Sequence, residues 1–100
     1  MHKKRKADLC SCAIFETNQF IKDLESIQKN TRQTIYNKIQ NYVYPQLRLN
    51  PFYGKNIKKL VNFKPPTWRY RIGNYRIFYE INEKEKIVFI LTLEIRHKAY

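Results

Sequence analysis

Acidic residues are scarce in this chain of 100 amino acids. Eight Asp and Glu stand against 20 Lys and Arg, the formal net charge is +12, and no acid occurs from Ser26 to Tyr79. Such a surface repels itself and is unusual without an anionic partner. We therefore expect a nucleic-acid partner. The alternative is a basic surface that serves solubility alone, although surfaces of that kind usually mix both signs.

Cysteine is also rare, and long apolar runs are missing. Cys10 and Cys12 stand one residue apart, so they cannot readily bridge each other, and no third cysteine exists. The chain is expected to be reduced and cytoplasmic. Two thiols without a matching Cys or His cluster make a weak metal site, so we expect no metal and no cofactor. The apolar runs are too short for a membrane span, and the run after HKKRK is too short for a signal peptide.

The composition, with 43% hydrophobic residues, suits one small domain with a single core. We predict that residues 1–8 form a disordered basic extension and that residues 9–100 form the domain. The domain would begin with an apolar strand from Leu9 to Phe15, in which Cys10 and Cys12 act as small hydrophobic residues.

The clearest local signal is the segment from Trp68 to Glu80, in which two alternating runs flank a Gly73-Asn74 turn. This pattern predicts a hairpin with a two-residue loop, because Gly and Asn tolerate the positive φ of primed turns. Arg71 then lies opposite Arg76, which is a local cost that an anionic ligand would relieve. The apolar face would carry Trp68, Tyr70, Ile72, Tyr75, Ile77 and Tyr79. The other face would carry Arg69, Arg71, Arg76 and Phe78.

Helical spacing precedes the hairpin. Thr17 or Asn18 is a suitable N-cap for a helix over residues 18–29, with a stripe of Phe20, Ile21, Leu24 and Ile27. A second stripe, formed by Ile35, Ile39, Tyr42, Val43 and Leu47, ends at the Asn50-Pro51 step. A basic loop follows at residues 51–66, in which the segment IKKL forms a short strand or a turn.

The last strand is predicted over residues 86–96, after a three-residue loop. Its apolar positions would face the core in phase with the hairpin: Ile87, Phe89, Leu91, Leu93 and Ile95. The predicted fold is therefore α+β with two layers and the order β-α-α-β-β-β, in which a helix hairpin packs on a mainly antiparallel sheet.

Five segments of the sequence match, in the same order, segments of a known protein family. They are QFIKDLESI, IKKL, WRYRIGNYRIFYEI, VFILTLEI and the terminal RHKAY. Together they span nearly all of Phe15 to Tyr100, and the chain resembles the RelE/ParE superfamily of toxins from toxin–antitoxin modules. The resemblance implies a growth inhibitor silenced by a cognate antitoxin protein. RelE-like members cleave messenger RNA in the ribosomal A site without metal, whereas ParE-like members inhibit DNA gyrase and cleave nothing. The fold alone does not separate these activities.

Metal-free RNA cleavage requires a base, a cationic cradle for the phosphate and an acid for the leaving oxygen. Arg71 and Arg76 are the candidates for the cradle, and Arg69 and Arg96 would flank them. The resemblance implies a phosphate-stabilising arginine in the strand WRYRI, which matches Arg71. The alternative for Arg71 is an ordinary solvated strand charge.

The resemblance also implies a lysine in the loop before the hairpin, as general base or charge stabiliser. Lys58 is the preferred match, with Lys55 or Lys59 as alternatives, and any of them is otherwise an ordinary exposed lysine. The glutamate that YoeB-like members carry in this loop is absent here, which argues against a carboxylate base.

The terminal RHKAY supplies His97 and Tyr100, which suit proton transfer or stacking on a base. They match the end of family members in type, with the register open, and an inert terminus is the alternative. Phe78 is either a stacking platform for a base or a residue packed beside Ile90.

The sequence therefore predicts an endoribonuclease toxin that acts on messenger RNA, in a ribosome-dependent manner, by attack of the 2′-hydroxyl on the scissile phosphate. The alternative is a ParE-like inhibitor of DNA gyrase, which needs no catalytic set. A third hypothesis is an inactive or housekeeping RNA-binding domain.

Overall fold

The computed structural model describes residues 11–95, so the predicted extension at residues 1–8 lies outside the described residues. Five strands form one sheet in the order β1-β5-β4-β3-β2. The strands are β1 (Ala13–Glu16), β2 (Ile57–Lys59), β3 (Trp68–Ile72), β4 (Tyr75–Asn82) and β5 (Ile87–Ile95). The helices are α2 (Asn18–Glu25), α3 (Lys29–Lys38), the π-helical turn η1 (Ile39–Val43) and α4 (Tyr44–Leu49).

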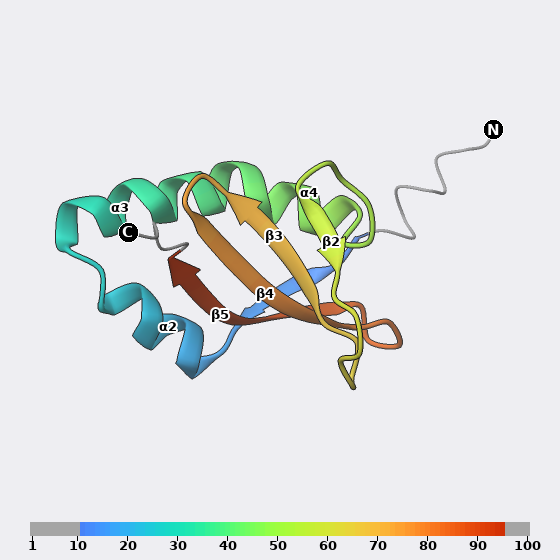
Figure 1. Cartoon of the computed structure of the whole chain (residues 1–100). Helices are drawn as coiled ribbons and strands as arrows, with labels where there is room; N and C mark the ends of the chain where they lie inside the picture. The colour runs from blue at the N-terminus through green and yellow to red at the C-terminus, as the bar shows by residue number, and fades with distance from the viewer. Residues whose placement is uncertain (1–10, 96–100) are drawn as a thin grey trace.

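The helices form one layer and the sheet forms the other (Figure 1). α3, η1 and α4 follow one another without a break as one long helical segment, and α2 is a separate short helix. The predicted α+β fold is confirmed, and the segment IKKL contributes the edge strand β2. All strand pairs are antiparallel except β1 with β5, which is parallel. No helix in residues 11–95 is both long enough and apolar enough to cross a membrane.

The hairpin of β3 and β4 has the predicted register. Arg71 lies opposite Arg76 and Arg69 lies opposite Phe78. Gly73 adopts a φ of 60°, in the left-handed region that a primed turn requires. The predicted apolar face packs on the helices, with Tyr79 fully buried and its hydroxyl donating to the carbonyl of Pro51 at 2.7 Å. The two faces of this hairpin were therefore predictable from alternation alone.

The face of β5 differs from the prediction. The turn after Asn82 holds four residues rather than three, and a bulge at Leu91 then adds one residue to β5 opposite β4. A shift of one residue exchanges the two faces of a strand, and a bulge exchanges them again. Val88 and Ile90 are consequently buried, whereas the predicted inward positions Ile87, Phe89 and Leu91 are not. Beyond the bulge the prediction holds, since Leu93 is buried and Ile95 pairs with Tyr75.

The long helical segment also departs from ideal spacing. In η1 the backbone N–H of Tyr44 donates to the carbonyl of Ile39, five residues back instead of four. This wider turn precedes Pro45, which has no N–H to donate. The wider turn changes the phase of the stripe, so Tyr44 is buried and Tyr42, which was predicted to be in the core, is 68% exposed.

A carboxylate between the layers accepts hydrogen bonds from two tyrosine hydroxyls. Tyr36 and Tyr44 donate to the same oxygen of Glu16, at 2.8 and 2.6 Å, and so tie the long helical segment to β1. Burial, reinforced by the hydrogen bond to Glu16 and its negative charge, raises the pKa of Tyr36 to about 12. The same causes raise the pKa of Tyr44 far above its ordinary value.

We expect these tyrosines to make the fold sensitive to alkali. The folded protein holds their protons more tightly than the unfolded chain, whose tyrosines titrate near 10. Their contribution to stability is thus fully present below pH 10 and is lost as the pH rises towards 12. The difference in unfolding free energy between wild type and Glu16→Gln should shrink over this range. It should stay constant for Glu25→Gln, an exposed control, and a constant difference for both variants would contradict the prediction.

Candidate nucleic-acid interface

The strand register places several cations on the sheet face that the helices leave open. Lys58 on β2 lies opposite Arg69 on β3, and Arg69 lies opposite Phe78 on β4. Residues directly opposite each other in antiparallel strands share a face, and positions two apart on one strand also share it. Arg71 and Arg76 therefore belong to the same face. We call Lys58, Arg69 and Arg71 the basic cluster.

Arg71 is a member of the basic cluster that is open to a ligand. Its side chain is exposed, and the guanidinium has no hydrogen-bond or ion-pair partner in residues 11–95. Its backbone N–H donates to the carbonyl of Asn56 at 3.0 Å, so the loop before β2 is anchored beside it. The backbone of Arg71 is thus fixed on the strand, and its exposed side chain shares the face with Lys58, which is also exposed.

Arg76 is compensated within the chain. Its Nη2 lies 3.1 Å from Oε1 of Glu94, the residue opposite it on β5, and its guanidinium carbon lies 5.8 Å from the ring centre of Phe78. The repulsion between Arg71 and Arg76 is therefore relieved by Glu94, without any ligand. Sequence reasoning missed Glu94 because the predicted register of β5 placed Thr92 opposite Arg76.

Two other predicted lysines do not join the basic cluster. Lys59 follows Lys58 on β2 and so points to the opposite face, where its Nζ lies 5.6 Å from the ring centre of Trp68. Lys55 is exposed in the loop before β2. Alternation along a strand separates Lys58 from Lys59, so only the first faces Arg69. The predicted roles of Arg96, His97 and Tyr100 concern residues outside the described part of the chain.

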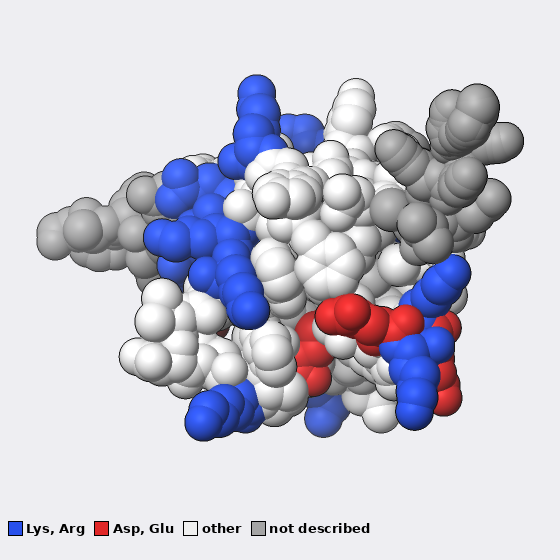
Figure 2. Space-filling view, turned by 90° about the vertical axis from the view of Figure 1, so that its right-hand side faces the viewer, with Lys and Arg blue, Asp and Glu red and all other residues white. Residues whose placement is uncertain are grey.

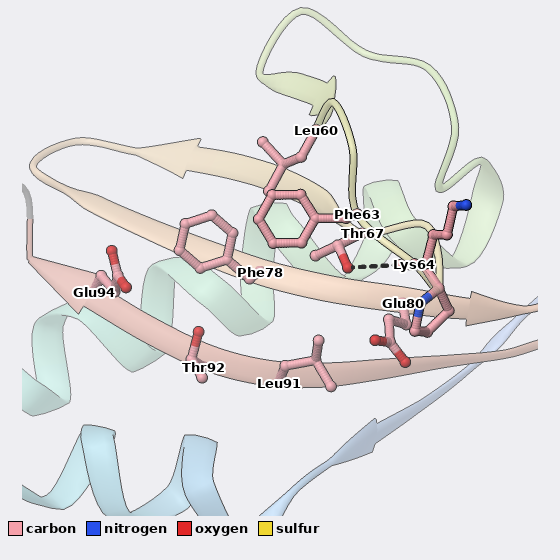
Figure 3. A pocket seen from close by; sticks show the side chains of 10 residues that line it. Leu60, Phe63, Lys64, Thr67, Phe78, Glu80, Leu91, Thr92 and Glu94 are labelled. Atoms are coloured by element: carbon pink, nitrogen blue, oxygen red, sulfur yellow. Dashed lines mark hydrogen bonds between the residues drawn. The ribbon is translucent and has the colours of Figure 1, made fainter.

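A groove of about 410 Å³ adjoins the basic cluster on the same face. Leu60, Phe63, Phe78 and Leu91 give it an apolar lining, and Glu80 and Glu94 lie at its two ends. Figure 3 shows these side chains on the near side of the sheet, with the helices behind it. Phe78 thus lines the groove and lies opposite Thr92. The alternative of packing beside Ile90 is wrong, because Ile90 is buried on the helix side of the sheet.

Charged side chains are unevenly distributed on the face shown in Figure 2. The largest group of Lys and Arg side chains lies left of the centre, and Asp and Glu side chains lie at the lower right, where further Lys and Arg side chains are beside them. No group of three or more His, Cys, Asp or Glu residues suited to hold a metal ion occurs within residues 11–95. The described part of this face therefore offers cations and an aromatic ring for an anionic ligand.

Solved structures share this architecture. The RelE chain of the archaeal RelE-RelB complex from Pyrococcus horikoshii OT3 is 25% identical, with a TM-score of 0.66 over 89% of this chain and 99% of that one. A chain of the toxin–antitoxin complex RelBE2 from Mycobacterium tuberculosis is 21% identical, with a TM-score of 0.68. The match covers 86% of this chain and 99% of that one. A chain of the RelB-RelE complex from Methanococcus jannaschii is 25% identical, with a TM-score of 0.56. The match covers 82% of this chain and 89% of that one.

The fold and its basic open face therefore define a toxin of the RelE/ParE superfamily. The family model described as the ParE toxin of the type II toxin–antitoxin system parDE matches residues 14–100 of the sequence. The chain belongs to this family. No curated protein sequence matches it.

Proposed function

We propose that this toxin is a metal-independent endoribonuclease that cleaves messenger RNA on the ribosome. The observation that carries the proposal is the basic cluster, in which three cations from β2 and β3 share an open sheet face beside an aromatic ring. Rigid strands hold such groups in fixed positions, as stabilisation of a developing charge requires. The likeness to RelE structures supports the same activity.

The reaction is an internal transfer of the phosphoryl group. A base removes the proton of the ribose 2′-hydroxyl, and the 2′-oxygen attacks the adjacent phosphorus. The bond from phosphorus to the 5′-oxygen of the next nucleotide breaks, and an acid protonates that oxygen. The products are a 2′,3′-cyclic phosphate and a 5′-hydroxyl end. Arg71 stabilises the extra negative charge through its planar fork, and Arg69 supports it from the adjacent position on the same face.

Lys58 is proposed as the general base or as a further charge stabiliser, because it lies directly opposite Arg69. His97 and Tyr100 are proposed as the proton donor and its partner, on the basis of the terminal RHKAY. Phe78 is proposed as the platform on which a base stacks. Arg76, being paired with Glu94, acts on the phosphate less directly than Arg71.

We further propose a cognate antitoxin protein as the partner that silences this toxin in the cytoplasm. Relatives with the same fold were crystallised as toxin–antitoxin complexes with RelB. The net charge of +12 favours an antitoxin segment rich in acidic residues.

The test of the ribonuclease proposal is primer extension on messages translated in cells that express the wild-type chain. We expect new 5′ ends inside coding regions, which disappear when translation initiation on the message is blocked. Growth arrest without any new 5′ end would contradict the proposal.

The family match supports a second candidate, inhibition of DNA gyrase without cleavage. In that case the basic face would bind protein, and purified toxin would block supercoiling of relaxed plasmid by gyrase. Supercoiling inhibited at a toxin-to-gyrase ratio near one, together with unchanged transcripts, would favour this candidate over the ribonuclease.

A further inference from the structure

We propose that the groove beside the basic cluster is a base-binding subsite selective for guanine, with Glu80 as the residue that reads the base. The inference rests on the proposed ribonuclease function. Its observations are independent of the basic cluster: an apolar groove of about 410 Å³, an aromatic ring on its floor and a carboxylate at one end.

The position of the groove suits a base whose phosphate is held by the cations. Phe78 lies directly opposite Arg69, one strand away, and Glu80 lies two residues further along β4 on the same face. Two residues along a strand span about 7 Å. An RNA strand bound at Arg69 and Arg71 can therefore place its base over Phe78 and direct the edge of the base towards Glu80. Bases in single-stranded RNA are commonly recognised by stacking and by hydrogen bonds to their edges.

The two glutamates of the groove are not equivalent. Glu94 is engaged by Arg76 at 3.1 Å. The carboxylate of Glu80 is half-buried and has no hydrogen-bond or ion-pair partner in residues 11–95. Figure 3 places it at the end of the groove opposite to Glu94. Glu80 is therefore the acceptor that a bound base meets.

The chemistry of the carboxylate selects the base. An ionised carboxylate has two acceptor oxygens and no donor. Guanine presents two neighbouring donors on its pairing edge, N1–H and the 2-amino group, which match both oxygens. Adenine and cytosine present one donor beside a ring-nitrogen acceptor, and uracil presents one donor between two carbonyls. Their acceptors would face the negative charge of Glu80, so only guanine makes the paired contact.

The experiment compares cleavage of ribosome-bound messages that differ only in the base on either side of the cut. The wild type should cut guanine sites about 10-fold faster than the others, as expected for one bidentate contact to a base. Glu80→Gln, which exchanges one acceptor for a donor of the same shape, should reduce this preference to about 2-fold or less while cleavage continues. Glu85→Gln, the same change at an exposed residue of the β4–β5 turn, should leave the preference unchanged.

A second measurement separates the two proposals. Guanosine, adenosine, cytidine and uridine 5′-monophosphates are titrated into the purified toxin, and binding is followed by NMR shifts of the groove residues. Binding that is selective for the guanine nucleotide and is lost in Glu80→Gln supports the subsite. This holds even if the wild type cleaves no message. Absence of cleavage would overturn only the ribonuclease proposal. Cleavage with the same base distribution in wild type and Glu80→Gln overturns the subsite. If Glu80→Gln keeps the base preference of the wild type but binds the antitoxin more weakly, the groove is a site for a protein partner, and the proposal of a base-binding subsite is also overturned.

Discussion

Replacing Arg71 by alanine is expected to lower the rate of RNA cleavage about 100- to 1,000-fold, the range found when one preorganised charge stabiliser is removed from an active site. The side chain is exposed on β3 and has no partner in the described residues, so the change removes no internal interaction. The unfolding free energy should therefore shift by about 0.5 kcal/mol or less. The measurements are cleavage in a reconstituted translation reaction and urea unfolding of the same preparation.

Three further variants make the Arg71 prediction specific. Arg71→Lys retains the charge without the planar fork and should give an intermediate rate. Arg76→Ala should cost less than Arg71→Ala, because the Arg76 charge is already balanced by Glu94. Arg48→Ala removes an exposed arginine on the helix layer and should leave cleavage unchanged. Equal losses in Arg71→Ala and Arg48→Ala would reduce the role of Arg71 to net charge alone.

Replacing Phe20 by alanine should produce the largest loss of stability, about 3–5 kcal/mol, as is typical for a buried aromatic residue. Phe20 is 0% exposed and is the buried residue of α2. Its surroundings cannot easily relax, because α2 is fixed to β5 on both sides of it. The hydroxyl of Thr17 donates to the carbonyl of Ile90 at 2.8 Å, and the N–H of Leu93 donates to Asp23 at 3.0 Å. The loss is large against the roughly 5–15 kcal/mol of a typical domain.

Ile21 provides the matched control for Phe20. It is the next residue on the same helix but is 39% exposed, so Ile21→Ala should cost about 1 kcal/mol or less. Urea denaturation gives the unfolding free energy of both variants. The slope of this free energy against urea concentration should equal that of the wild type if the denatured state is unaffected. Similar losses in the two variants would show that α2 does not dock on the sheet through Phe20.

The site was predictable to the extent that it depends on the hairpin. A two-residue Gly-Asn turn sets the pairing of Arg71 with Arg76 locally, so alternation was enough to place both arginines on one face. The segment IKKL carried two candidate lysines with nothing local to choose between them. The choice is made by the pairing of β2 with β3, which places Lys58 opposite Arg69 and Lys59 opposite Trp68.

The groove could not be predicted in the same way, because its lining comes from three separate segments. Leu60 and Phe63 come from the loop after β2, Phe78 and Glu80 from β4, and Leu91 from β5. Leu91 was expected in the core and lies instead on the open face, as a result of the longer turn and the bulge. No periodic pattern in the sequence indicates where a bulge interrupts a strand.

The sequence by itself determined the order of the elements apart from the edge strand β2, the faces of the hairpin and the strongly basic character of the chain. Each of these depends on near neighbours or on composition: a turn, an alternation, a helical stripe, a count of charges. Only the tertiary structure decided the phase of β5, the burial of Tyr44 instead of Tyr42, and the pairing of Arg76 with Glu94. The physical reason is that a bulge and a wide helical turn each shift the register by one residue. Which shift the chain adopts depends on how segments far apart in the sequence pack together.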